Sequence, residues 1–94
     1  MNKPTEYTIR VTPSAEKDID KLRKQIQIKD FHRIDTTVRL LASDPRPNGA
    51  RKIRTRAAEY RIRVGKFRVV YEIDDNNKLV LILHVARRSE TTYN

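Results

Sequence analysis

Polar and apolar side chains alternate at the start of the chain and then recur at helical spacing. Residues 6–11, Glu-Tyr-Thr-Ile-Arg-Val, follow a period of two and predict a strand. Thr12 and Pro13 predict a helix start, because threonine caps helix N-termini and proline is tolerated at the first helical position. The apolar face of this helix comprises Ala15, Ile19, Leu22 and Ile26.

A similar pattern predicts a second helix, which ends before a run of turn residues. Asp30 is placed to cap its N-terminus. Its apolar face comprises Phe31, Ile34, Val38 and Leu41. Residues 44–49, Asp-Pro-Arg-Pro-Asn-Gly, concentrate turn-forming side chains and end the helix. The first half of the chain is therefore expected to form a strand and a helical hairpin.

The second half of the chain has the pattern of strands separated by turns. The predicted strands cover residues 52–54, 59–64, 67–73 and 78–85. Gly65-Lys66 is typical of a two-residue hairpin turn, and residues 74–77 form the next turn. We therefore expect a single α+β domain over residues 1–94. It has an N-terminal strand, a helical hairpin and a three- to four-stranded antiparallel sheet, with the helices over one sheet face.

The hairpin turn decides which side chains share a face of the sheet. With Gly65-Lys66 as the turn, Arg63 pairs with Arg68. One face then carries the apolar side chains of Tyr60, Ile62, Val64, Phe67, Val69 and Tyr71. The other face carries Arg61, Arg63 and Arg68 and is left to solvent or to a ligand.

The net charge indicates that this ligand is a polyanion. Lys plus Arg number 21 against 12 Asp plus Glu, a formal charge of +9. Residues 51–68 hold eight basic side chains opposed only by Glu59, so this segment supplies +7 (eight minus one). Such a concentration favours nucleic acid, because neutralising phosphates releases counterions. An acidic protein and an anionic membrane surface are the alternatives.

Composition also bears on compartment and cofactors. Cysteine is absent, so disulfides and thiolate metal sites are excluded and a reducing compartment, the cytoplasm, is expected. The sequence has no bilayer-spanning apolar run and no signal-peptide pattern, so we expect no membrane partner. Neither His32 nor His84 has a companion at metal-ligand spacing, and two glycines cannot form a phosphate loop. We therefore expect no metal and no cofactor.

The facing arginines of the hairpin are the most informative feature. Like charges directly opposed destabilise a sheet by up to about 1 kcal/mol. A bound phosphate would offset this cost, because guanidinium groups make charge-assisted and often bidentate contacts with it. Alternatively, Glu59 or Glu72 neutralises the pair, or the side chains extend into water. Residues 51–56 and the tail residues Arg87, Arg88 and Tyr93 are candidates to join the same face.

Two stretches of the sequence carry a family resemblance. The first comprises residues 52–54 and 59–73, the latter reading Glu-Tyr-Arg-Ile-Arg-Val-Gly-Lys-Phe-Arg-Val-Val-Tyr-Glu-Ile. The second is residues 84–93, His-Val-Ala-Arg-Arg-Ser-Glu-Thr-Thr-Tyr. Together with the order of elements they resemble the RelE branch of the RelE/ParE toxin superfamily over essentially the whole chain. The resemblance implies a small microbial RNase-like fold and ribosome-dependent cleavage of mRNA in the A site, by 2′-OH attack on the adjacent phosphate.

The resemblance also implies roles for individual residues. Arg61 and Arg63 occupy positions where some relatives carry lysine, and Arg68 corresponds to the arginine that contacts the scissile phosphate. Arg87 corresponds to an arginine linked to leaving-group stabilisation, and Tyr93 to a tyrosine that stacks on or activates the nucleotide. The remaining residues expected to bind RNA are Arg51, Lys52, Arg54, Arg56, Lys66 and Arg88.

Arginine at positions 61 and 63 affects the choice of general base. A guanidinium is effectively never deprotonated, so neither residue can accept a proton. Two alternatives are open. A Tyr93 phenolate favoured by nearby arginines takes the proton, or catalysis is mainly electrostatic stabilisation of the transition state.

A partner protein follows from the same resemblance. It implies a cognate antitoxin, acidic in its toxin-binding segment, that represses its own operon with the toxin as co-repressor, so operator DNA is met only indirectly. Charge complementarity with a +9 domain supports such a partner. Two other functions stay open, a ParE-type inhibitor of DNA gyrase and a non-catalytic RNA-binding module.

Overall fold

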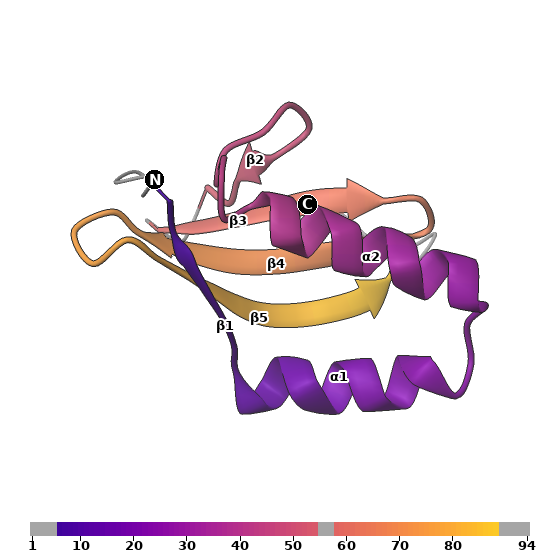
Figure 1. Cartoon of the computed structure of the whole chain (residues 1–94). Coiled ribbons are helices and arrows are strands. Elements are labelled where there is room, and N and C mark those ends of the chain that lie inside the picture. Colours follow the sequence, from indigo (N-terminus) through magenta and orange to yellow (C-terminus); the bar gives the residue numbers. More distant parts are fainter. Residues whose placement is uncertain (1–5, 55–57, 89–94) are drawn as a thin grey trace.

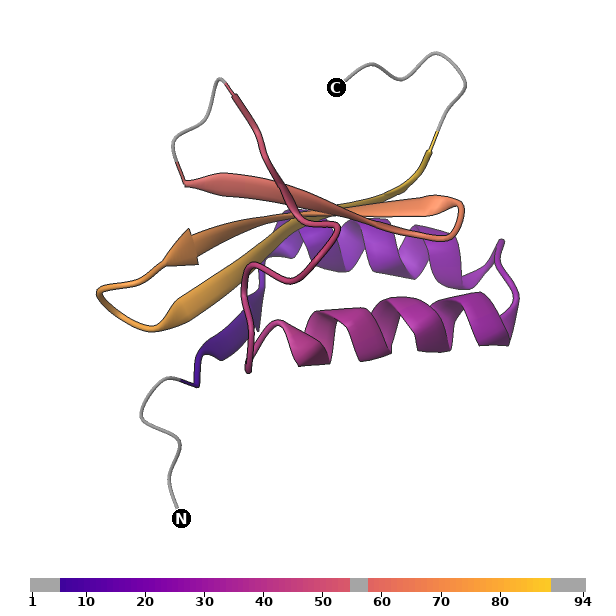
Figure 2. The same ribbon diagram turned by 90° about the horizontal axis from the view of Figure 1, so that it is seen from above.

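The computed structural model describes residues 6–54 and 58–88, and the fold is α+β as predicted. Two helices lie against one face of a single sheet, and neither helix covers the opposite face (Figure 1, Figure 2). The elements in chain order are β1 (Thr8–Val11), α1 (Pro13–Arg23), α2 (Ile28–Leu40), β2 (Arg51–Lys52), β3 (Glu59–Val64), β4 (Phe67–Asp74) and β5 (Leu79–Arg87). In the described part of the chain, no helix is long and apolar enough to cross a bilayer.

The five strands form one sheet in the order β1-β5-β4-β3-β2. The strands that follow the helices pair antiparallel, as predicted. β1 adds a fifth strand that runs parallel to β5, which the sequence pattern did not predict. Thr12 secures this junction, since its hydroxyl donates to the Ile82 carbonyl at 2.8 Å across 70 positions of sequence. The same oxygen accepts the Ala15 N–H at 3.3 Å, so Thr12 also caps α1 as predicted.

The start of α2 differs from the prediction. The helix begins at Ile28 with Gln27 as its N-cap residue, so the predicted Asp30 cap is wrong. Asp30 lies in the first turn, where a carboxylate is favourable near the positive end of the helix dipole. The Gln25 and Ile26 N–H groups donate hydrogen bonds to the Leu22 carbonyl at the end of α1. The connection between α1 and α2 is therefore short, and α2 begins two residues before Asp30.

The β3–β4 hairpin has the predicted register. Arg63 lies opposite Arg68 and Val64 opposite Phe67. Gly65 adopts a φ of +59°, a left-handed conformation that favours glycine at this turn. Of the predicted apolar face, five side chains are buried under the helices and Tyr60 is partly buried. Arg61, Arg63 and Arg68 lie on the opposite face of the same hairpin.

The pairing of β4 with β5 contains a bulge. Tyr71 pairs with Ile82 but Val70 pairs with His84, which leaves Leu83 as an extra residue on β5. Because side chains alternate between faces, the extra residue exchanges the faces of every later β5 residue. Val85 is consequently buried, with 2% of its surface exposed.

Among the described residues, the largest fully buried side chain is that of Tyr71. Its ring lies beside that of Tyr60, with centroids 6.0 Å apart and an interplanar angle of 23°. Its hydroxyl donates to the Pro45 carbonyl at 2.7 Å, which fastens the loop after α2 to the sheet. Burial raises the pKa of this phenol well above its ordinary value, so the hydroxyl stays protonated as a donor.

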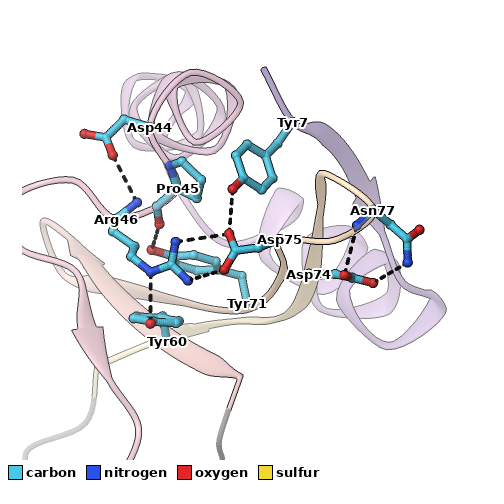
Figure 3. Close-up of polar contacts among 9 residues, drawn as sticks. All are labelled: Tyr7, Asp44, Pro45, Arg46, Tyr60, Tyr71, Asp74, Asp75 and Asn77. Carbon is cyan, nitrogen blue, oxygen red and sulfur yellow. Dashed lines mark hydrogen bonds and ion pairs between the residues drawn. The ribbon is translucent and has the colours of Figure 1, made fainter. Parts of the chain in front are cut away.

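At the end of the sheet away from Gly65-Lys66, the Arg46 guanidinium joins separate segments of the chain (Figure 3). Its Nη2 donates to Asp75 Oδ2 at 2.9 Å, and its Nε donates to the Tyr60 hydroxyl at 3.0 Å. The Tyr7 hydroxyl donates to Asp75 Oδ1 at 2.5 Å. The hydrogen bonds from Arg46 and then Tyr7 lower the pKa of Asp75. This network connects the loop after α2, strand β3, the β4–β5 turn and the segment before β1.

Replacing Asp75 with asparagine is expected to lower the melting temperature at pH 7, because the carboxylate that accepts these bonds is lost. The lowered pKa of Asp75 means that its contribution is present above the ordinary aspartate pKa of about 3.9 and disappears as the pH falls through the folded-state value. The difference between wild type and Asp75→Asn should therefore shrink in acid. Thermal melts at neutral and acidic pH measure it, with exposed Asp20→Asn on α1 as the control. A difference unchanged by acid would contradict this expectation.

Candidate functional site

The open face of the sheet carries arginines on three adjacent strands. Arg51 on β2 lies opposite Arg61 on β3. Arg63, two positions further along β3, lies opposite Arg68 on β4. Alternation places all four on the face away from the helices. Arg51, Arg61 and Arg63 also line one hollow of about 520 Å³ together with Asn48 and Gly49.

The cationic crowding is reflected in the titration of Arg61, which is partly buried among the others. Desolvation lowers its pKa, and the charges of Arg63, Arg68, Arg51 and Arg88 lower it further. Arginine nevertheless stays charged at neutral pH. Several like charges are thus held within electrostatic reach of one another, and a bound anion would relieve their repulsion.

Arg88 joins this group, whereas Arg87 does not. Arg88 N donates to the Lys66 carbonyl at 2.6 Å, and its Nη1 donates to the Gly65 carbonyl at 3.2 Å. Arg87 pairs with Phe67, which points to the helix side, and its guanidinium carbon lies 5.1 Å from the centroid of the Phe67 ring. The expectation that Arg87 joins the arginine face is therefore wrong. Its physical cause is the Leu83 bulge, which exchanges the faces of the two tail arginines.

We call the resulting set the arginine surface; it comprises Arg51, Arg61, Arg63, Arg68 and Arg88. Carboxylates lie further along the same face, where Glu59 is paired with Glu72 across β3 and β4. Arg63 and Glu59 are separated by four residues, about 13 Å along the strand. The two glutamates therefore border the surface on its Arg61 side, at the end away from the Arg63–Arg68 pair.

The other predicted site residues are placed differently. Lys52 pairs with Tyr60, so it lies on the opposite side of β2 from Arg51. Arg54 is exposed after β2, and Lys66 is exposed in the hairpin turn. Arg56 and Tyr93 lie outside the described residues.

The two histidines lie near the site without forming a metal centre. His84 occupies the position opposite Val70, but its Nδ1 is 3.4 Å from Asp18 Oδ2 at the sheet edge. The same Asp18 oxygen accepts the Val85 N–H at 3.0 Å. His32 lines a separate hollow beside Arg63. Within residues 6–54 and 58–88, no three His, Asp or Glu side chains gather as metal ligands would.

The arrangement can bind phosphate and stabilise charge that develops on it. Guanidinium groups offer paired donors that match phosphate oxygens, and they are pre-positioned here by paired backbone positions on β3 and β4. Arginine cannot supply a base, so the surface fits a reaction in which positive charge carries most of the catalysis.

The amino-acid sequence matches known toxins over most of its length. Residues 9–92 match the family model of the ParE toxin of the type II toxin–antitoxin system parDE. The chain is 33% identical over 86 residues to Toxin RelG of Mycobacterium tuberculosis, a match that covers 89% of this chain and 93% of that toxin.

Solved structures give the same result for the fold. The toxin–antitoxin complex RelBE2 of Mycobacterium tuberculosis matches with a TM-score of 0.72 and 28% identity, covering 88% of this chain and 99% of that chain. The archaeal RelE–RelB complex from Pyrococcus horikoshii matches with a TM-score of 0.76 at 20% identity, over 92% and 99% of the two chains. The isolated E. coli RelE toxin matches with 0.73 at 17%, over 90% and 87%. The latter two matches concern the fold alone.

Proposed function

Because the chain belongs to the RelE/ParE superfamily of toxins of type II toxin–antitoxin systems, we propose that it is a ribosome-dependent endoribonuclease that cuts mRNA in the A site. The observation that carries this proposal is the Arg63–Arg68 pair, two cations fixed opposite each other on an open sheet face. Two guanidinium groups at facing positions can contact the oxygens of one phosphodiester, which favours a nucleic-acid substrate.

The proposed reaction is an internal transfer at one phosphate. The 2′ oxygen forms a bond to phosphorus while the bond from phosphorus to the 5′ oxygen breaks. The 2′-OH loses its proton and the 5′ oxygen gains one, so the products are a 2′,3′-cyclic phosphate and a 5′-OH. Negative charge builds up on the non-bridging oxygens in the transition state, where fixed guanidinium groups stabilise it most.

Arg68 is proposed to contact the scissile phosphate, with Arg61 and Arg63 beside it on β3. Arg88 extends the same surface over the hairpin turn. The tail roles suggested for Arg87 and Tyr93 rest on resemblance. For Arg87, leaving-group stabilisation would require its side chain to leave the Phe67 ring. Proton transfer is proposed to fall to Tyr93 or to substrate and solvent, since the arginines cannot accept a proton.

We also propose a cognate antitoxin as the partner in the cytoplasm. The solved relatives from Mycobacterium tuberculosis and Pyrococcus horikoshii are toxin–antitoxin complexes. An acidic antitoxin segment would complement the arginine surface and thereby exclude RNA from it. Operator DNA is then contacted through the antitoxin, with the toxin as co-repressor.

Primer extension on an mRNA in a purified translation system tests the proposed activity. We expect new cuts within A-site codons when the antitoxin-free protein is added, and none on the same mRNA without ribosomes. A folded sample that yields no cuts under either condition would refute the proposal.

Gyrase inhibition is the second candidate, because the matching family model is that of a ParE toxin. A DNA supercoiling assay with purified gyrase separates the two functions. Loss of supercoiling together with intact mRNA would identify a gyrase inhibitor. Cut mRNA with unimpaired supercoiling would identify the endoribonuclease.

A further inference from the structure

A second basic hollow lies on the helix side of the hairpin turn. It is a cavity of about 480 Å³ between the start of α2, the Gly65-Lys66 turn and the end of β5. We call it the basic cavity; the lining side chains that matter here are Lys29, Asp30, Arg33, Lys66, Phe67 and Arg87. None of them belongs to the arginine surface, which faces the other way.

The lining of the basic cavity is strongly cationic. Four basic side chains face one carboxylate, that of Asp30. Asp30 Oδ1 lies 3.9 Å from Arg33 Nη1, and Arg33 is 61% exposed, so this ion pair is loose. Loose exposed pairs contribute little, and the guanidinium keeps donors for another anion. The net charge of the lining is +3 (four minus one).

Two of the four cations are positioned by the hairpin. Arg87 lies over the Phe67 ring, which restrains its guanidinium while leaving in-plane N–H groups for an acceptor. Arg33 packs against the turn itself, because a Cβ added at Gly65 would meet Arg33 Nη1 at 3.1 Å. The absence of a side chain at Gly65 thus lets a guanidinium from α2 come up to the tip of the hairpin.

The basic cavity shares lining residues with a hollow that includes Arg63 of the open face. Arg33 and Gly65 also line a neighbouring hollow of about 380 Å³ that contains Arg63. On the other side of the turn, Arg88 reaches the Gly65 carbonyl. Cations therefore follow one another around the hairpin tip, from the arginine surface to the helix side.

The geometry points to a second phosphate-binding site in the basic cavity, which holds the backbone of the same RNA at a phosphate that is not cut. This inference rests on the proposed function, since it extends the contact with the proposed substrate. A polymer with a charge on every unit suits an unbroken series of cations, whereas an acidic protein segment spaces its charges irregularly. Such a contact would fix the register of the strand without reading its bases.

The test compares two doubly substituted proteins that each lose two positive charges. Lys29→Gln/Arg33→Gln alters the basic cavity, and Lys17→Gln/Lys21→Gln alters exposed positions on α1 as the matched control. The probe is a 2′-O-methylated oligouridylate of about 12 nucleotides, which fits one binding face and cannot be cut by 2′-OH attack. Binding is followed by fluorescence anisotropy over a range of salt concentrations, and melting curves verify folding of each variant.

We expect Lys29→Gln/Arg33→Gln to weaken binding about tenfold relative to the control. The slope of log K against log salt should also fall by about 0.7 for each phosphate that the variant no longer neutralises. Equal binding and equal slopes in the two variants would overturn the second site. If Arg63→Ala then still lowers binding, the proposed function stands without it. A wild-type protein that does not bind the probe overturns the second site and leaves the ribosome-dependent activity to the primer-extension test. Suppose that Lys29→Gln/Arg33→Gln binds the oligouridylate as the control does but no longer binds polyglutamate. That result would assign the cavity to an acidic protein and would also overturn the inference.

Discussion

Replacing Arg68 with alanine is expected to lower ribosome-dependent mRNA cleavage about 100- to 1,000-fold, as the loss of one fixed group that stabilises transition-state charge does elsewhere. Arg68 faces Arg63 across the hairpin on the arginine surface. The substitution removes one of the two facing guanidinium groups and keeps the backbone hydrogen bonds between β3 and β4. Primer extension in a purified translation system measures the rate of cutting.

Two further variants define the cause of this loss. Arg68→Lys keeps the charge but lacks the planar fork, so we expect an intermediate rate. Arg39→Ala removes an exposed arginine on α2 whose partner is Asp35, and it should cut as fast as wild type. Stability of Arg68→Ala should stay within about 1 kcal/mol of wild type, because relief of like-charge repulsion offsets the reduced packing. Full cutting by Arg68→Ala, or an equal loss in Arg39→Ala, would contradict the assigned role.

Replacing Tyr71 with alanine is expected to lower the free energy of unfolding by about 3–5 kcal/mol, the range for deleting a large buried aromatic ring. Tyr71 is the largest fully buried side chain, and it stacks on Tyr60. A domain of this size has little stability to spare, so much of the variant should be unfolded at 37 °C. Urea denaturation followed by circular dichroism measures the change.

The companion variant Tyr71→Phe separates the ring from its hydroxyl. It keeps the packing but removes the hydrogen bond to the Pro45 carbonyl, and we expect a loss of about 1–2 kcal/mol. A loss in Tyr71→Phe as large as that in Tyr71→Ala would mean that the loop contact, and not the ring, holds the core together. Val11→Ala, at a side chain with 39% exposure, is the control and should change little.

Local features of the fold were predictable because short-range chemistry sets them. A two-residue turn at Gly65-Lys66 admits one register, so the Arg63–Arg68 pairing followed directly from the sequence. The start of α1 at Thr12-Pro13 was equally local. The parallel pairing of β1 with β5 was not, because nothing near residues 8–11 in sequence indicates a partner 71 positions away.

The exchange of Arg87 and Arg88 was missed for a related reason. Strict alternation along β5 would have put Arg87 on the open face, but Leu83 is inserted into the ladder. The buried positions are Val80, Ile82 and then Val85, a step of three in place of two. The sequence pattern did not indicate this step, because Leu79, Leu81 and Leu83 make the strand apolar on both faces. Arg33 gave no signal at all, since α2 meets the hairpin only in the folded chain.

The position of β5 in the sheet has a consequence for the order in which the protein can assemble during synthesis. β5 lies between β1 and β4, so it is the strand to which both halves of the molecule attach. It is also the latest of the described strands to leave the ribosome, while β1 is the earliest. A nascent chain can therefore close the β3–β4 hairpin but cannot fix β1 and α1 in place, nor bring Arg88 to Gly65. The fold proposed to cut mRNA therefore cannot be completed before β5 has been synthesised.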